Sequence, residues 1–243
     1  MHADHIDVLR ACAEEIGAAV ADHRGRGYSG LRDTQYHLDV VADEVALRVL
    51  GGAGLRVVSE ESGVSGHGDL TVVVDPIDGS TNCDRGIPFY STSLALLRHG
   101  VLVAGVVKNQ ATGEVFCAEH GAGATRDGRP IHVSGRTEPA SAIAGYSGYP
   151  ALDLGWWQMR ALGAASLEIC LVADGSIDLF GVAGRSTLNP WDYLAGVAIA
   201  LEAGASVADL RGEDLVTDDA VLRRPVVAAT PELLAVAMGA GEI

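Results

Sequence analysis

Acidic residues that directly follow apolar runs are the first feature of this chain that could do chemistry. The apolar run 72–74 leads straight into Asp75 and Asp78, and Glu60-Glu61 follows another apolar run. Asp192 stands at a predicted helix start, where capping is the ordinary role of a single acid. Several carboxylates at the end of a buried strand repel one another and lose hydration, which raises their pKa values or demands a compensating cation. Oxygen ligands without a His or Cys cluster favour Mg²⁺, Mn²⁺ or Ca²⁺ over zinc.

The residues after Asp78 could bind a phosphate group. Gly79-Ser80-Thr81-Asn82 would begin a short helix, because the glycine permits a tight turn. The free N–H groups of a helix start, together with hydroxyl side chains, bind phosphate oxygens. Metal-binding carboxylates beside such a turn indicate metal-assisted phosphate hydrolysis.

The elements that must position these residues change in type along the chain. Apolar residues at steps of three and four predict helices over 6–20 and from about Asp39 to Val49. Short apolar runs between 55 and 118 predict a mostly antiparallel sheet, with a hairpin turn at Arg98-His-Gly100. From about Ser134 strands and helices alternate, which is typical of an α/β unit. The expected strands of this second part are 142–145, 177–180, 206–208 and 226–229, and the expected helices are 164–173, 192–203 and 232–238.

We therefore expect two domains, an N-terminal α+β metal-binding domain over 1–135 and a C-terminal α/β domain over 136–243. The segment between Gly145 and Leu162 is too short for a full crossover helix with two flanking strands, since a parallel crossover needs a dozen or more residues. Trp156-Trp157 in this segment would serve either core packing or a dimer contact or pocket wall.

Composition and charge exclude several classes of protein. The 243 residues include 17 Lys and Arg against 32 Asp and Glu, which gives a net charge of −15. This acidic balance argues against nucleic-acid binding and against docking on anionic lipid. The N-terminus is unlike a signal peptide and the apolar runs are too short to span a bilayer, so we expect a cytoplasmic protein without membrane contact. The four cysteines form no CxxC pair and are expected to be reduced thiols.

Four motifs resemble those of the inositol monophosphatase family of Mg²⁺-dependent, lithium-sensitive phosphatases. Asp75-Pro-Ile-Asp-Gly-Ser-Thr-Asn82 is close to the family signature, and Trp191-Asp-Tyr-Leu-Ala-Gly196 matches the second signature. Glu60-Glu61 matches the acidic pair, and Asp33-Thr-Gln-Tyr-His-Leu-Asp39 is similar to a degraded D-x-V-T-x-x-D motif. The resemblance covers almost the whole chain. It implies a layered αβαβα sandwich of the inositol monophosphatase and fructose-1,6-bisphosphatase type, usually as a homodimer.

The resemblance also implies a metal-binding role for each matched acid. Glu60, Asp75 and the carbonyl oxygen of Ile77 would hold one ion, and Asp75, Asp78 and Asp192 would hold a second. Two or three Mg²⁺ ions are therefore expected, with Mn²⁺ as a substitute.

Catalytic and phosphate-binding roles follow from the same resemblance. A weaker third ion would lie by Glu60, aided through water by Asp39. Ser80 takes the position of a family threonine, and with Glu60 it would orient and deprotonate the attacking water. Gly79, Ser80 and Thr81 would bind the phosphate through their backbone amides, and Asp78 and Asp192 would face the substrate beside them.

The chain departs from the family pattern at three places. Tyr36 stands where the family has a threonine, which affects the region of the third ion. The family's Gly-Thr-Ala-Ala run reads Gly163-Ala-Ala-Ser166, so a hydroxyl is lost. No acid occurs in 179–191, where the inositol enzymes carry a Glu, and Arg185 lies there instead. Arg185 would bind either a second anionic group of the substrate or only solvent.

These features predict a Mg²⁺-dependent phosphomonoesterase that hydrolyses a small sugar, cyclitol or nucleoside phosphate with a metal-activated water. Relatives with the same metal site act on fructose 1,6-bisphosphate, histidinol phosphate or 3′-phosphoadenosine 5′-phosphate, and these substrates remain alternatives. A non-catalytic regulatory protein on the same fold is an alternative from another class. The retained acids Glu60, Asp75, Asp78 and Asp192 argue against it, because a retired site would be free to lose them.

Overall fold

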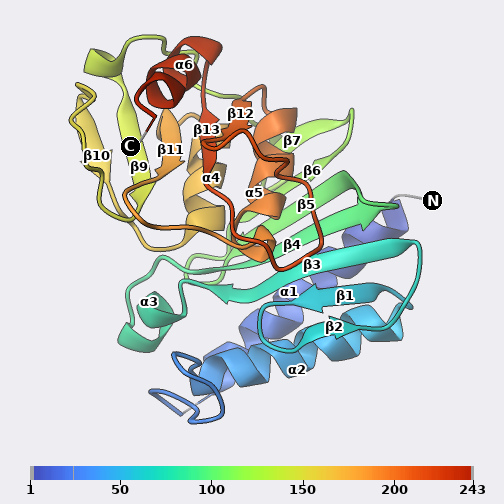
Figure 1. The fold of residues 1–243 in the computed structure, drawn as a ribbon. Helices are drawn as coiled ribbons and strands as arrows, with labels where there is room; N and C mark the ends of the chain where they lie inside the picture. The colour runs from blue at the N-terminus through green and yellow to red at the C-terminus, as the bar shows by residue number, and fades with distance from the viewer. Residues whose placement is uncertain (1–2, 24, 242–243) are drawn as a thin grey trace.

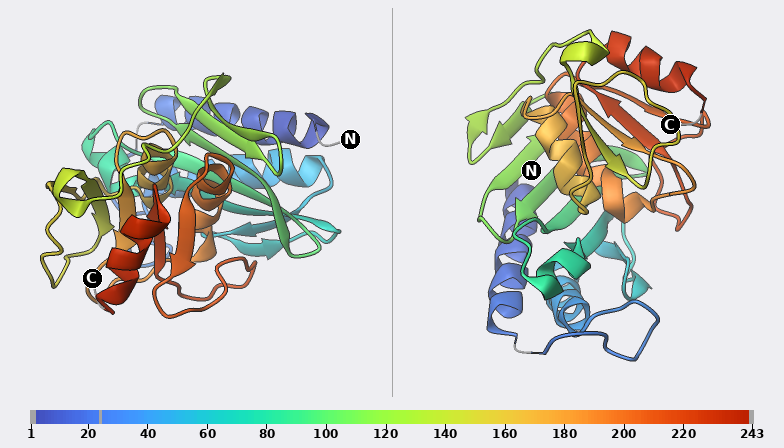
Figure 2. Two further views of the ribbon diagram at one scale, coloured as in Figure 1. Left: turned by 90° about the horizontal axis from the view of Figure 1, so that it is seen from above. Right: turned by 90° about the vertical axis from the view of Figure 1, so that its left-hand side faces the viewer.

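The computed structural model describes residues 3–23 and 25–241 and shows five layers of alternating helices and sheets (Figure 1). Helices α1 and α2 cover one face of an eight-stranded sheet, and α4 and α5 cover the other. The second sheet has five strands and packs on the same pair of helices, while α6 covers its far side. The two rotated views in Figure 2 show the same stacking. The expected αβαβα sandwich is thus confirmed.

The helices are α1 (Ala3–Asp22), α2 (His37–Gly52), α3 (Ser80–Arg85), α4 (Ala165–Ala173), α5 (Pro190–Glu202) and α6 (Pro231–Gly239), with a 3₁₀ turn at Pro139–Ser141. The first sheet, in spatial order, consists of β2 (Gly63–Ser65), β1 (Arg56–Ser59), β3 (Leu70–Asp78), β4 (Ser91–Arg98), β5 (Val101–Asn109), β6 (Val115–Glu119), β7 (Gly123–Arg126) and β8 (Arg129–Pro130). The second sheet, also in spatial order, consists of β10 (Gln158–Arg160), β9 (Ile143–Ser147), β11 (Leu179–Val182), β13 (Pro225–Ala228) and β12 (Ser206–Asp209).

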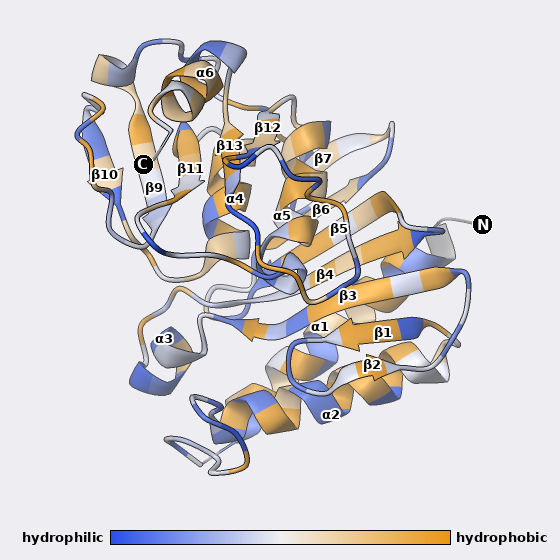
Figure 3. Ribbon diagram, viewed as in Figure 1, coloured by the Kyte–Doolittle hydropathy of each residue, from blue (hydrophilic) through white to orange (hydrophobic). Residues whose placement is uncertain are grey.

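Strand β3 lies at the centre of the first sheet and is buried on both faces. Val72 and Val74 pack against α1 and α2, whereas Val73 packs into the middle layer around α4 and α5. A strand covered on both faces reads as a continuous apolar run, which explains Val72-Val-Val ahead of the acids. The hydropathy colouring in Figure 3 shows β3 as mostly apolar.

Helix α5 packs closely on the first sheet because a glycine lies beneath it. A Cβ atom at Gly105 of β5 would come within 2.5 Å of the carbonyl oxygen of Ala195 in α5. Only a residue without a side chain permits this approach. The close packing sets the position of the helix that carries Asp192.

The predicted elements are confirmed with small shifts in their bounds. Helix α2 begins at His37, two residues earlier than expected, and β11 occupies 179–182 rather than 177–180. The hairpin turn at Arg98-His-Gly100 is confirmed, with positive φ angles at His99 and Gly100. The short strands β2, β7, β8 and β10 are additions that the apolar pattern did not predict.

The shortened segment 148–157 contains no helix, as its length led us to expect. Strands β9 and β10 pair in parallel although only this loop joins them. The side chain of Trp156 is buried and donates from Nε1 to the hydroxyl of Tyr146 at 2.6 Å, whereas Trp157 is 59 % exposed. Trp156 therefore serves core packing.

The change from the first sheet to the second occurs between residues 130 and 143. The division into domains 1–135 and 136–243 stays a prediction. Helix α5 of the second part packs on β4, β5 and β6 of the first, so the two parts share the middle layer. All four cysteines are free thiols. None of the described helices is both long and apolar enough to cross a membrane.

Candidate active site

Glu60 and Asp75 lie side by side because β1 and β3 are parallel. Their register pairs Ser59 with Val74, so Glu60, just beyond the end of β1, lies next to Asp75 of β3. The backbone N–H of Glu60 donates to the carbonyl oxygen of Val74 at 3.1 Å and continues this pairing beyond the strand end. Two residues from separate segments are thereby fixed as neighbours.

Asp192 reaches the same edge from the middle layer. Asn189 is the N-cap of α5, and its backbone N–H donates to the Asp192 carboxylate at 2.6 Å. Ser93 of β4 lies opposite Asp75 in the ladder and donates from its hydroxyl to the carbonyl oxygen of Trp191 at 3.0 Å. The helix start is therefore attached to the strand beside Asp75.

The three carboxylates of Glu60, Asp75 and Asp192 converge on one point. One oxygen from each lies within 4.8 Å of the other two. One oxygen of Asp75 is buried without any hydrogen-bond partner. A buried and unpartnered carboxylate oxygen is costly unless a cation binds it. The donor set consists of carboxylates only, which fits Mg²⁺ or Mn²⁺.

Burial and mutual repulsion shift the protonation of these acids. Burial, reinforced by the Glu61 carboxylate, raises the pKa of Glu60 to about 7. Burial and then repulsion from Glu60 and Asp78 raise the pKa of Asp75 well above its ordinary value, and burial does the same for Asp192. Each shift means that the charged form lacks compensation, which a divalent cation would supply.

Asp78 takes a different arrangement from the other three acids. Its two carboxylate oxygens accept hydrogen bonds from the start of α4: from the backbone N–H of Ala165 at 3.2 Å, and from the N–H and hydroxyl of Ser166 at 2.7 and 2.6 Å. Burial raises its pKa to about 6, and the bonds from Ser166 oppose that shift. Asp78 is not part of the group formed by Glu60, Asp75 and Asp192. Its role as a metal ligand stays a prediction.

The turn after Asp78 requires glycine. Gly79 has φ +85°, and a Cβ there would lie 3.0 Å from the carbonyl oxygen of Gly163. Helix α3 begins at Ser80, as the sequence predicted. Asn82 donates to the carbonyl oxygens of Phe89 and Leu162, each at 2.8 Å, and so joins α3 to the loop before α4.

Besides a pocket of about 450 Å³ lined by Glu60, Trp191 and Asp218, two pockets border the acids. The first has about 320 Å³ and lies towards α2; its lining residues include Glu60, Asp39, Tyr36, Ser80 and Thr81. Asp39 is buried, accepts from the N–H of Tyr36 at 2.8 Å, and leaves its other oxygen without a partner. Burial raises the pKa of Asp39 to about 7.

The second pocket has about 310 Å³ and lies between the two sheets. Asp78 and Asp192 form part of its wall, together with Tyr146, Tyr149 and Leu188. Arg185 is exposed, and it is not among the described residues that line this pocket. Its predicted part in substrate binding has no support from this geometry and stays a prediction.

The comparisons with known proteins decide the family. The family model for the inositol monophosphatases matches residues 10–240. The chain belongs to the inositol monophosphatase family. It is 41 % identical over 181 residues to a fructose-1,6-bisphosphatase/inositol-1-monophosphatase of Archaeoglobus fulgidus, covering 73 % of this chain and 71 % of the relative. It is 32 % identical over 193 residues to the Nus factor SuhB of Xylella fastidiosa, covering 73 % and 69 %.

The solved structures agree with this assignment. A Pyrococcus horikoshii protein described as similar to inositol-1 monophosphatase superposes with a TM-score of 0.83 at 29 % identity, over 98 % of this chain and 96 % of that one. This inositol monophosphatase family member is a phosphomonoesterase whose acidic cluster could bind metal.

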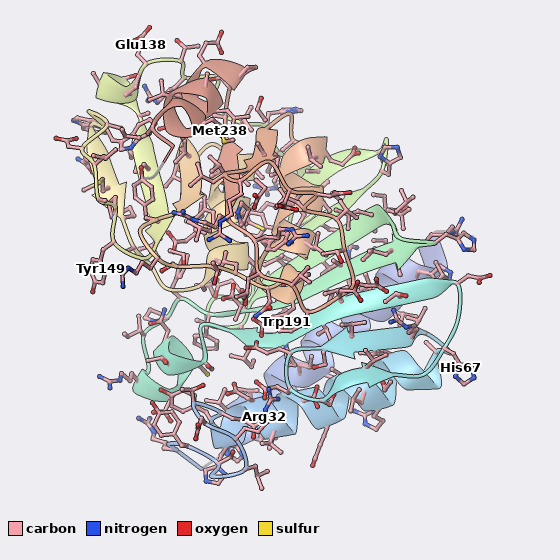
Figure 4. The ribbon with its side chains drawn as sticks, viewed as in Figure 1. Arg32, His67, Glu138, Tyr149, Trp191 and Met238 are labelled. Atoms are coloured by element: carbon pink, nitrogen blue, oxygen red, sulfur yellow. The ribbon has the colours of Figure 1, made fainter. Side chains whose placement is uncertain are left out.

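Two side chains at the site of this family member are not predicted by its motifs. Arg32 donates to the carbonyl oxygens of Glu60, at 3.2 Å, and Glu61, and its guanidinium lies 3.5 Å from the Glu61 carboxylate. Figure 4 labels Arg32 in the loop before α2 and Trp191 at the start of α5, and both residues line one pocket with Glu60. The position of Arg32 directly before Asp33, which opens the Asp33–Asp39 motif, was the only indication of this role in the sequence.

Glu168 is the other unpredicted residue. It is buried in the first turn of α4 and lines the second pocket. One carboxylate oxygen accepts from the N–H groups of Leu162 and Gly163, both at 3.1 Å, and the other has no partner. Burial raises the pKa of Glu168 to about 7. Glu168 thus holds the loop that contacts Asn82 and precedes the donors to Asp78.

Proposed function

We propose that this family member hydrolyses the monophosphate ester of a small sugar or cyclitol, with Mg²⁺ as its cofactor. One observation carries the proposal: Glu60, Asp75 and Asp192 converge from three separate elements around a buried, unpartnered oxygen. A divalent cation would compensate the charge of such a cluster. It lies beside the start of α3 and between two pockets large enough for small molecules.

The residues that would hold the cations are those of the cluster and its neighbours. Asp75 would bridge the ions that Glu60 and Asp192 help to hold, and Asp78 and the carbonyl oxygen of Ile77 follow Asp75 closely in the chain. We expect two or three Mg²⁺ ions, with Mn²⁺ as a substitute. When bound, such ions neutralise phosphate charge and lower the pKa of water.

The chain's own residues would bind and orient the reacting groups. The backbone amides of Gly79, Ser80 and Thr81 would hold the phosphate, a role that the turn at Gly79 and the start of α3 support. Glu60 would accept the proton of the attacking water, and the Ser80 hydroxyl would orient that water. Asp39 would assist from the first pocket.

The lining of the second pocket favours a leaving group without a second phosphate. It contains no lysine or arginine among the described residues that line it, so a second phosphate would find no cation there. This favours a monophosphate, with a sugar or cyclitol first, over fructose 1,6-bisphosphate or 3′-phosphoadenosine 5′-phosphate, whereas histidinol phosphate, which carries a single phosphate, stays an alternative. We also expect a cytoplasmic homodimer, for which the mass in solution is the test.

A non-catalytic regulatory role is the second candidate, because relatives include a Nus factor SuhB. The net charge of −15 argues against direct contact with RNA. The buried, unpartnered Asp75 oxygen favours catalysis, because a purely regulatory protein has no need to retain it.

A phosphate-release screen over phosphorylated metabolites with Mg²⁺ tests the proposal. We expect the highest kcat/KM for a sugar or cyclitol monophosphate, loss of activity with a chelator, and a decrease of about 10³-fold or more in Asp75→Asn. Asp22→Asn, an exposed acid at the end of α1, is the matched control and should retain full activity. Absence of phosphate release from every compound would reject the proposal in favour of the regulatory role.

A further inference from the structure

The side chain of Tyr36 connects the loop before α2 to the start of α3. Its hydroxyl oxygen lies 3.0 Å from Oγ of Thr81, and the two residues are far apart in the chain. The ring is buried and packs on that of Tyr28, with centroids 4.7 Å apart. The phenol is therefore held in place by more than the one hydrogen bond.

The geometry at Thr81 determines how its hydroxyl can act towards an anion. A threonine hydroxyl has one proton to donate and two lone pairs that accept. Either oxygen of the Tyr36–Thr81 pair could be the donor. A phosphate oxygen at Thr81 would accept the threonine proton, so Tyr36 would then have to donate to Oγ. The phenol would fix the direction of the Thr81 hydroxyl and strengthen its bond to the anion.

A second contact ties the same residue to the acids. The backbone N–H of Tyr36 donates to Asp39 at 2.8 Å, and Asp39, Thr81 and Glu60 all line the first pocket. Tyr36 thus holds a carboxylate with its main chain and a hydroxyl with its side chain. Both groups face the same space beside Ser80.

We propose that Tyr36 is a positioning residue that orients the Thr81 hydroxyl towards the phosphate of the substrate. The inference rests on the proposed phosphatase function. The family's threonine at this position is too short to provide a phenol, so the role is specific to this chain's tyrosine. Because the bond acts on phosphate already present in the ground state, it should affect binding more than the chemical step.

The variant Tyr36→Phe tests the proposal, since it retains the ring and its packing on Tyr28. We expect the Kd for inorganic phosphate in the presence of Mg²⁺, and the KM for p-nitrophenyl phosphate, each to rise roughly tenfold. The value of kcat should change less than threefold. Thr81→Val should raise both constants by a similar factor. The double variant should have the same Kd and KM as Thr81→Val alone, because Tyr36 acts on the phosphate only through the Thr81 hydroxyl.

The controls separate this inference from the proposed function. Tyr90→Phe removes a phenol hydroxyl from the segment next to α3 and should change neither constant. If the wild type releases no phosphate and binds none, the proposed function itself fails. If the wild type is active but Tyr36→Phe retains its Kd and KM, or loses only kcat, the positioning role is rejected. Should Tyr36→Phe be unfolded by circular dichroism, an unchanged KM in Thr81→Val would reject it equally.

Discussion

The hydroxyl of Ser93 donates to the main-chain carbonyl oxygen of Trp191 at 3.0 Å, across the boundary between the first sheet and the middle layer. Ser93 lies opposite Asp75 in the sheet, and Trp191 directly precedes Asp192. This one bond therefore sets the spacing between two carboxylates that come from different layers. Its effect on metal binding can be measured.

We expect Ser93→Ala to weaken Mg²⁺ binding several-fold and to cost about 1 kcal/mol of folding stability, because one buried carbonyl loses its donor. Calorimetric titration with Mg²⁺ measures the first effect and urea denaturation the second. Ser141→Ala is the matched control, since its hydroxyl also donates to a carbonyl oxygen, that of Glu138, but at an exposed turn in the second part. Equal Mg²⁺ affinity in the two variants would contradict the assigned role.

The protonation of the site predicts how stability depends on pH without metal. Burial raises the pKa of Glu60 and Asp39 to about 7, and that of Asp78 to about 6, above unfolded values near 4. The folded state then binds more protons than the unfolded state between about pH 4 and 7, so these groups lose their stabilising contribution as pH rises through that window.

Urea denaturation at pH 5 and pH 8 in the presence of a chelator measures this dependence. We expect these acids to lower stability at pH 8, and saturating Mg²⁺ to restore more stability at pH 8 than at pH 5, because the cation binds the charged carboxylates. Asp75→Asn, which removes one buried charge, should reduce the difference between the two pH values. A Mg²⁺ stabilisation that is greater at pH 5 would count against this electrostatic account.

Glu168 should be essential for its shape and acceptor oxygen rather than for its charge. Glu168→Ala removes the acceptor for Leu162 and Gly163 and leaves a cavity, so we expect a loss of roughly 2–3 kcal/mol of stability. Glu168→Gln keeps one carbonyl oxygen in the same place, and its stability should stay within about 1 kcal/mol of the wild type. Chemical denaturation compares the two. Equal losses would show that the charge itself is required.

Gly79 offers a test of backbone geometry, with Gly86 as an internal control. Both residues have positive φ angles, +85° and +73°, so both substitutions strain the backbone. Only a Cβ at Gly79 meets another segment, 3.0 Å from the Gly163 carbonyl oxygen, whereas nothing lies within 4 Å at Gly86. We expect Gly79→Ala to lose about 1–2 kcal/mol more stability than Gly86→Ala, and to raise KM as α3 shifts. Thermal melts and steady-state kinetics measure both; equal melting temperatures would refute the argument.

The sequence by itself determined the elements and the chemistry of the acids. The apolar run before Asp75, the glycine at 79 and the helical periodicity of α1 and α2 are local signals, because strand burial, positive φ and amphipathic helices each depend on near neighbours. The family motifs added the layered fold and the metal-binding chemistry. The short strands β2, β7, β8 and β10 were missed because two to four residues carry too little periodicity.

Only the tertiary structure decided which of these groups meet. It brought Asp192 to Glu60 and Asp75 through the parallel register of β1 and β3 and the bond from Ser93 to Trp191, and it directed Asp78 instead to the start of α4. It also determined the contacts of Arg32, Tyr36 and Glu168 beside the acids; the first motif indicated only the neighbourhood of Arg32 and Tyr36, and no motif indicated Glu168. The physical reason is that a side chain's partners across a sheet or between layers depend on packing and register, which local propensity does not specify.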